Sequence, residues 1–184
     1  FFALIACVSI WNYKTQIISW RYEITGSSLD HSSETFGWLM VSFLAISGNY
    51  IFGTLLTANG SLKELNILAF FGILVNVSLN LILIPIKGSE GAAFASAFTQ
   101  FFILIFQIGL CYKFFKFSFE LYSFIQISLF TILFILIIFV LDNYFNIIWN
   151  EKLIVSLFMG LILGLLLKLI NLKQLFELLK TSKS

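Results

Sequence analysis

The stretch from Leu65 to Ile86 reads LNILAFFGILVNVSLNLILIPI, and the stretch from Gly91 to Tyr112 reads GAAFASAFTQFFILIFQIGLCY. Neither contains a charged side chain, and about 20 mostly apolar residues suffice for an α-helix to cross a bilayer. Neither alternates apolar with polar residues, as a strand of a membrane β-barrel does, and each is about twice the length that such a strand needs. The two stretches predict a pair of membrane helices joined by the short turn Lys87–Glu90.

The composition of the whole chain indicates the same class of protein. Of its 184 residues, 60% are hydrophobic and 11% are charged, and the net charge is +2. A soluble domain carries about 25% charged residues, and its fold could not bury this much apolar surface. The small net charge argues against a nucleic-acid partner, and the apolar content excludes a disordered chain. We expect an all-α, polytopic bundle whose surroundings are the lipid bilayer.

Hydropathy predicts about six transmembrane helices within residues 1–171. Their predicted ranges are 1–20, 35–58, 65–86, 91–112, 121–141 and 153–171. The first is a span if the apolar run continues to Trp20 with Lys14 inside it, or if residues upstream of Phe1 extend it. The polar stretch Arg21–Glu34 is predicted to be the longest loop, and Pro85 to help end the third helix. Because the chain begins inside an apolar run without Met, we expect it to be the C-terminal part of a longer protein.

The distribution of basic residues predicts an orientation. With six spans, seven lysines and arginines lie on the side of the even-numbered connections and the tail, against four on the other side. Cytoplasmic segments carry the excess of these residues, which predicts a cytoplasmic C-terminus. Residues 172–184 are predicted to form a basic cytoplasmic tail, as a short interfacial helix or as a solvated end.

Three consecutive predicted helices each carry a stripe of small and polar residues at helical spacing. The stripes contain Asn49 in the second helix, Asn76 and Asn80 in the third, and Ser96 and Gln100 in the fourth. A polar side chain in the bilayer requires a partner or a cavity. These amides either join helices, at about 0.6–2 kcal/mol each, or line a water-filled cavity where they could bind sugar hydroxyls.

Lys14 and Arg21 are the two cations that could approach such a cavity from the first helix. They either extend to the membrane surface or hold a pyrophosphate group. No Asp or Glu lies inside a predicted span, so these segments contain no proton relay.

No catalytic constellation is evident in the sequence. The one histidine, His31, has no partner motif, and the chain has no P-loop, HExxH motif or nucleophile elbow. Cys7 and Cys111 lie in apolar runs, where free cysteines act as small hydrophobic residues. We expect no enzyme activity, no metal site and no cofactor.

Three sequence blocks in residues 35–110 resemble a known family. They are L.A.G..K at Leu56–Lys63, N…N..LIP at Asn76–Pro85 and G..GAA.A at Gly88–Ala95. In this order and spacing they are similar to the C-terminal half of bacterial polysaccharide (O-antigen type) flippases. These belong to the superfamily that also contains the MATE multidrug exporters and the lipid II flippases.

The resemblance implies an architecture and a substrate. It implies two helical bundles around a central cavity, of which this chain would be the second and the N-terminal bundle would be missing. It also implies a place in the bacterial inner (cytoplasmic) membrane. The substrate would be an undecaprenyl-pyrophosphate-linked oligosaccharide, moved outward by alternating access for polysaccharide and O-antigen biosynthesis in the cell envelope. Two other readings stay open: a MATE-type cation-coupled drug antiporter and a membrane scaffold without transport.

Overall fold

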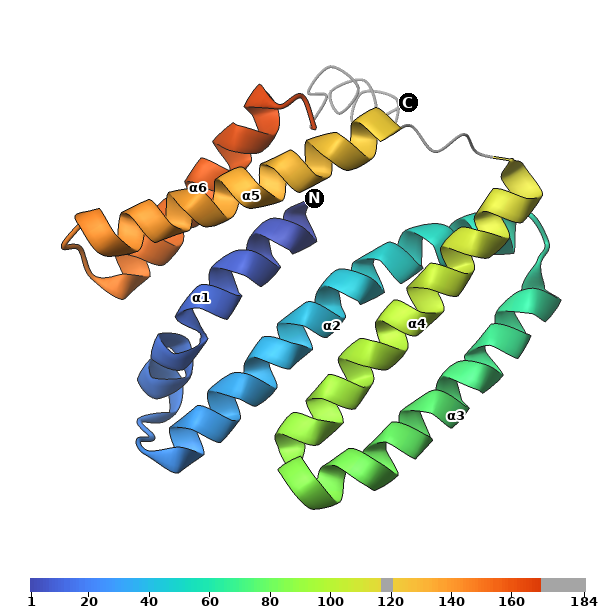
Figure 1. The fold of residues 1–184 in the computed structure, drawn as a ribbon, viewed down its shortest axis with the longest axis horizontal. Helices are drawn as coiled ribbons and strands as arrows, with labels where there is room; N and C mark the ends of the chain where they lie inside the picture. The colour runs from blue at the N-terminus through green and yellow to red at the C-terminus, as the bar shows by residue number, and fades with distance from the viewer. Residues whose placement is uncertain (117–120, 170–184) are drawn as a thin grey trace, which may run out of the picture. The chain divides into compact units, whose positions relative to one another are not determined.

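The computed structural model describes residues 1–116 and 121–169 and consists of α-helices (Figure 1). In chain order they are α1 (Phe2–Tyr22), α2 (Ser27–Ala58), α3 (Leu62–Lys87), α4 (Ser89–Phe115), α5 (Leu121–Tyr144) and α6 (Trp149–Leu166). No strand occurs within those two described ranges. The predicted all-α class and the six predicted helices are confirmed.

Five of the described helices are long and apolar enough to cross a membrane. The qualifying segments are Ser27–Ala58, Leu62–Lys87, Ser89–Phe115, Ile125–Tyr144 and Trp149–Leu166. The α1 helix continues past Trp20, as a sixth span would require, but its polar half with Lys14 and Arg21 keeps it outside this set. The chain is a multi-pass membrane protein.

Two helix boundaries differ from the predicted ones by more than four residues. The α2 helix begins at Ser27, eight residues before the predicted start, so Ser27–Glu34 is helical rather than a loop. Its polar side chains bond within the helix: the Ser33 hydroxyl donates to the Asp30 carbonyl at 2.9 Å. The α6 helix ends at Leu166 rather than at 171. The tail predicted for residues 172–184 lies outside the described residues.

The chain divides into two compact units, and the larger comprises residues 6–119. In this unit α4 packs against both α2 and α3 and lies between them (Figure 1). Because α3 reverses the chain direction between them, α2 and α4 run parallel. The Trp38 ring of α2 packs edge-on against Phe94 of α4, with ring centroids 4.8 Å apart.

Small residues bring α4 close to its two neighbours. A side chain at Gly48 of α2 would meet Leu104, and a side chain at Gly72 of α3 would meet Ile103, each at 2.8 Å. At the α3–α4 turn, Gly91 lies directly against the backbone of α3. Glycine is required at Gly91, because the obstructing atoms there belong to the backbone, whereas at Gly48 and Gly72 the ends of the Leu104 and Ile103 side chains would have to shift.

The smaller unit contains residues 1–5 together with α5 and α6. Phe130 and Phe134 of α5 are fully buried, and their rings stack with centroids 5.6 Å apart. On α6, Gly160 leaves room for Phe134 and Ile5, which a Cβ atom would meet at 2.9 and 3.0 Å. Side chains rather than a second backbone therefore fill the space beside Gly160.

Candidate functional site

The α2–α4 interface contains an amide pair. The half-buried Asn49 of α2 donates from Nδ2 to the Gln100 side-chain oxygen at 2.8 Å and to the Gln100 backbone carbonyl at 3.0 Å. Both bonds cross between the two helices. The structure thus brings together two of the predicted site residues that lie 51 positions apart in the chain.

The α3–α4 interface contains a hydrogen-bond relay. Asn80 Nδ2 donates to Asn76 Oδ1 at 2.9 Å, one helical turn away on α3. Asn76 Nδ2 then donates across the interface to Thr99 Oγ1 at 3.3 Å. The buried Thr99 hydroxyl in turn donates to the Ala95 carbonyl at 2.8 Å. The relay connects α3 to α4 by the bond from Asn76 to Thr99.

The amide pair and the relay meet at one level of the larger unit. Thr99 and Gln100 are consecutive on α4 and face α3 and α2 respectively, so five residues form one layer across three helices. We call this layer the amide belt: Asn49, Asn76, Asn80, Thr99 and Gln100. At 1.5 Å per residue, Asn76 lies about 21 Å from the start of α3 and about 17 Å from its end. The belt is therefore close to the midpoint of a membrane helix.

The larger unit also holds amide oxygens without donors. Among the described residues, Asn49 Oδ1, Asn80 Oδ1 and Gln107 Oε1 are buried and accept no hydrogen bond. Gln107 lies two turns beyond Gln100 and faces Gly53 of α2, where a Cβ would be 3.5 Å from its Nε2. An unpaired buried acceptor costs about 1–3 kcal/mol. The three unpaired oxygens could therefore accept hydrogen bonds from a donor that enters the bundle.

Lys14 takes part in an ion pair between α1 and α2. Its Nζ lies 2.6 Å from Glu34 Oε1, and the two side chains are 12% and 42% exposed. The same Nζ lies 4.0 Å from the Trp11 ring centroid, which adds a cation–π contact. A 32-residue helix such as α2 is about 48 Å long, more than the roughly 30 Å hydrocarbon core. Glu34, about 10 Å from its start, lies in the polar end of that helix.

The two remaining predicted site residues stand apart from the belt. Arg21 is exposed at the end of α1, with its guanidinium 5.6 Å from the Tyr22 ring. Ser96 is half-buried on α4, one turn before Gln100. The structure therefore joins four of the seven predicted residues in the belt, pairs Lys14 with Glu34, and leaves Arg21 at the surface.

Three polar residues of the larger unit were missed by sequence reasoning. Glu34 was assigned to a loop, because the polar sequence before Thr35 hid the true start of α2. Thr99 lies three residues after Ser96 in the same apolar run, and its spacing from Ala95 was the available signal. Gln107 is buried on α4 with Gly53 of α2 opposite it, and nothing in the sequence indicates that placement.

The described residues contain no cluster of His, Cys, Asp or Glu that could hold a metal ion. The chemistry that this site offers is therefore that of neutral amides and hydroxyls at mid-depth, with one ion pair nearer the polar end of α2. The chain matches no family model, no curated protein and no solved structure.

Proposed function

We propose that this chain is part of a membrane transporter that flips lipid-linked oligosaccharides, with an undecaprenyl-pyrophosphate carrier, across the bacterial inner membrane. The amide belt is the observation that supports this proposal best. Substrate sites of transporters lie near the bilayer midplane, and polar groups retained at that depth mark substrate paths. Neutral amides suit a sugar, because they exchange hydrogen bonds with hydroxyl groups without a change of charge.

The unpaired acceptors give the proposal its mechanism. Asn49 Oδ1, Asn80 Oδ1 and Gln107 Oε1 accept no bond from the described residues, whereas sugar hydroxyls or water could donate to all three. Under alternating access, a state that opens the bundle toward one side would gain these bonds. The stored cost of about 1–3 kcal/mol for each acceptor would then favour opening when a hydroxyl-rich substrate arrives. An upstream bundle of the same protein would form the other wall of the cavity.

A genetic experiment tests the substrate. Deletion of the gene in its own organism is expected to abolish surface polysaccharide and to accumulate lipid-linked repeat units on the cytoplasmic face of the membrane. Normal surface polysaccharide in the deletion strain would contradict the proposal. Replacement of Asn49 and Asn76 by Leu in the restored gene is expected to reduce export, with the amount of protein in the membrane as the control.

A membrane scaffold without transport is the second candidate, and one observation favours it. Asn49, Asn76 and Gln100 bond across helix interfaces, and Asn80 bonds to Asn76 on its own helix. Such bonds are expected of residues that only hold helices together. The two candidates differ in whether water reaches the belt.

Cysteine labelling separates transporter from scaffold. In a background with Cys7→Ala and Cys111→Ala, a transporter would allow a membrane-impermeant maleimide to label Ser96→Cys in intact vesicles. Ile105 is 65% exposed on α4, so Ile105→Cys is the matched control and should stay unlabelled in lipid. If Ser96→Cys is labelled no faster than Ile105→Cys from either side of the membrane, the scaffold is the better description.

A further inference from the structure

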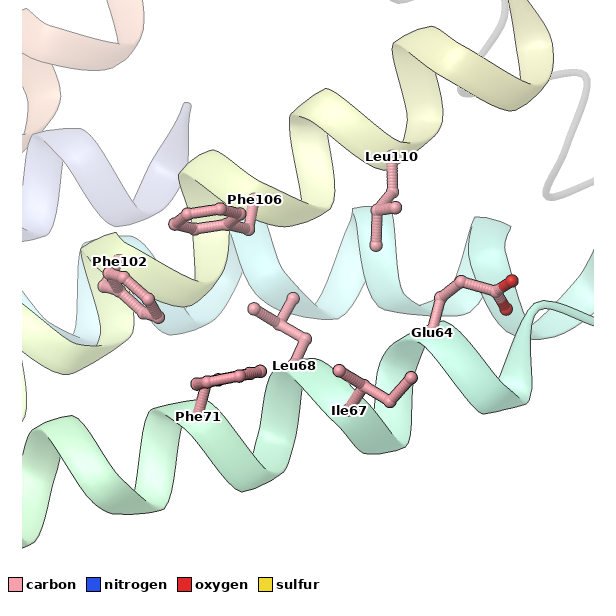
Figure 2. A pocket seen from close by; sticks show the side chains of 7 residues that line it. All are labelled: Glu64, Ile67, Leu68, Phe71, Phe102, Phe106 and Leu110. Atoms are coloured by element: carbon pink, nitrogen blue, oxygen red, sulfur yellow. The ribbon is translucent and has the colours of Figure 1, made fainter.

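An apolar groove runs between α3 and α4 (Figure 2). Its volume is about 440 Å³. We call it the α3–α4 groove, and its apolar lining consists of Ile67, Leu68, Phe71, Phe102, Phe106 and Leu110. Figure 2 shows the side chains of the two helices pointing toward one another across it. From Glu64 to Phe71 the groove extends about 10 Å along α3, the length of a segment of an acyl chain.

The groove has one charged end. Glu64 is the only charged residue of its lining, and its carboxylate lies at the end of the groove away from the phenylalanines (Figure 2). Lys63 precedes Glu64 on α3, four residues before Ile67, and Lys113 follows Leu110 by three residues on α4. Helical spacing places Lys113 on the groove-lining face of α4, and the exposed Lys63 beside the groove-lining face of α3. Lys116 caps α4 at the same end of the helix pair.

The charges at this end are not paired within the described part of the chain. Lys63, Glu64, Lys113 and Lys116 take part in no ion pair or hydrogen bond between side chains there. Lys113 makes only a long contact with the Phe114 ring, at 5.8 Å. Three cations against one carboxylate give this end a positive charge, which complements a phosphate group.

We propose that the α3–α4 groove binds one acyl chain of an anionic phospholipid, whose head-group phosphate is held by Lys63 and Lys113. The apolar lining surrounds the acyl chain as neighbouring lipids otherwise would. The lysines lie at helix ends, at the depth of a lipid head group. Basic residues at such sites bind anionic head groups. The site is separate from the amide belt and does not depend on the proposed transport function.

Lipid titration followed by native mass spectrometry tests the site. The full chain is released from micelles that contain phosphatidylglycerol, phosphatidylcholine or phosphatidylethanolamine, and the retained lipid is counted. The protein is expected to retain one phosphatidylglycerol. Each lysine should contribute about fivefold to affinity, so Lys63→Gln with Lys113→Gln should weaken phosphatidylglycerol binding about 30-fold. Lys87→Gln, at the opposite end of α3, is the matched control and should bind as the unmodified protein does.

A second variant tests the groove itself. Ile67 is 49% exposed, so Ile67→Trp should fold and fill the groove. It is expected to weaken phosphatidylglycerol binding about tenfold, the effect of displacing about two methylene groups. Far-UV circular dichroism checks that the double lysine variant and Ile67→Trp keep their helices.

Several results would overturn the proposal. Equal retention of phosphatidylcholine, or stronger retention of phosphatidylethanolamine, would show that the head group is not chosen for its negative charge. Unchanged binding in Ile67→Trp would place the lipid elsewhere. A dimer in lipid-free detergent that Ile67→Trp abolishes, with lipid retention unchanged, would make the groove an interface between two copies of the chain. Retention of no lipid at all would remove the site.

Discussion

Replacing Gly91 by alanine should separate α3 from α4 at their turn. Gly91 is buried at the start of α4, and a Cβ atom there would lie 2.5 Å from the Leu83 carbonyl oxygen and 2.7 Å from its carbon. Real Cβ atoms essentially never come closer than 3.0 Å to another heavy atom. Because the obstructing atoms belong to the backbone, they cannot rotate away as a side chain would. The two helices must therefore move apart by about half an ångström. Because a packed interface is hardly compressible, the displacement is passed on to the neighbouring contacts.

The size of the effect follows from two opposing contributions. Inserting a methyl group into a packed contact costs about 1–3 kcal/mol, and removing a glycine from a helix returns about 0.5–1 kcal/mol. We therefore expect Gly91→Ala to lower the free energy of unfolding by about 0–2.5 kcal/mol. Gly109→Ala on the same helix is the control, because no atom lies within 4 Å of its added Cβ. That variant should be more stable than the unmodified protein by about 0.5–1 kcal/mol.

Unfolding in mixed micelles measures both variants. The full chain is titrated from a non-ionic detergent into sodium dodecyl sulfate, and helix content is followed by far-UV circular dichroism. The expected order of midpoints is Gly109→Ala, then the unmodified protein, then Gly91→Ala. If Gly91→Ala proves as stable as Gly109→Ala, the close contact of α4 with the α3 backbone is refuted.

Two further predictions concern the polar contacts. A double-mutant cycle of Lys14→Gln and Glu34→Gln, read from the same unfolding curves, should give a coupling energy of about 0.2–1 kcal/mol, because Glu34 is 42% exposed to screening. Additive single changes would argue against the pair. Asn76→Leu should lower the free energy of unfolding by about 0.6–2 kcal/mol, because it removes the bond to α4 and the partner of Asn80. Asn66→Leu, at an exposed position of α3, is the control and should change stability little. Equal effects of the two variants would contradict the relay.

The helices of this protein were predictable because membrane thickness sets their length. An apolar run of about 20 residues has few alternatives to a helix in a bilayer, and α3, α4 and α5 appear close to their predicted ranges. The start of α2 was not predictable by the same reasoning. Hydropathy marks where a helix enters the hydrocarbon, whereas Ser27–Glu34 is a polar extension of the helix, supported by contacts such as that of His31 with Glu90 at 4.0 Å.

The candidate site was predictable in part. Asn76 and Asn80 lie four residues apart, so their bond on one helix face follows from the sequence. The bond of Asn49 to Gln100 does not, because it depends on the axial offset between two parallel helices, which neither helix encodes alone. The Lys14–Glu34 pair was hidden for another reason: a carboxylate assigned to a loop has no predictable partner on a helix.

The parallel packing of α2 on α4 has a consequence for the biogenesis of the protein. Asn49 enters the membrane with α2, but its partner Gln100 is synthesised 51 residues later, about 3–10 s afterwards at the usual rate of translation. During that interval the amide has no partner from α4 and faces either the hydrocarbon or the insertion machinery. The ribosome must therefore complete a further helical hairpin before α2 can settle, and a pause between α2 and α4 would prolong the most vulnerable stage of insertion.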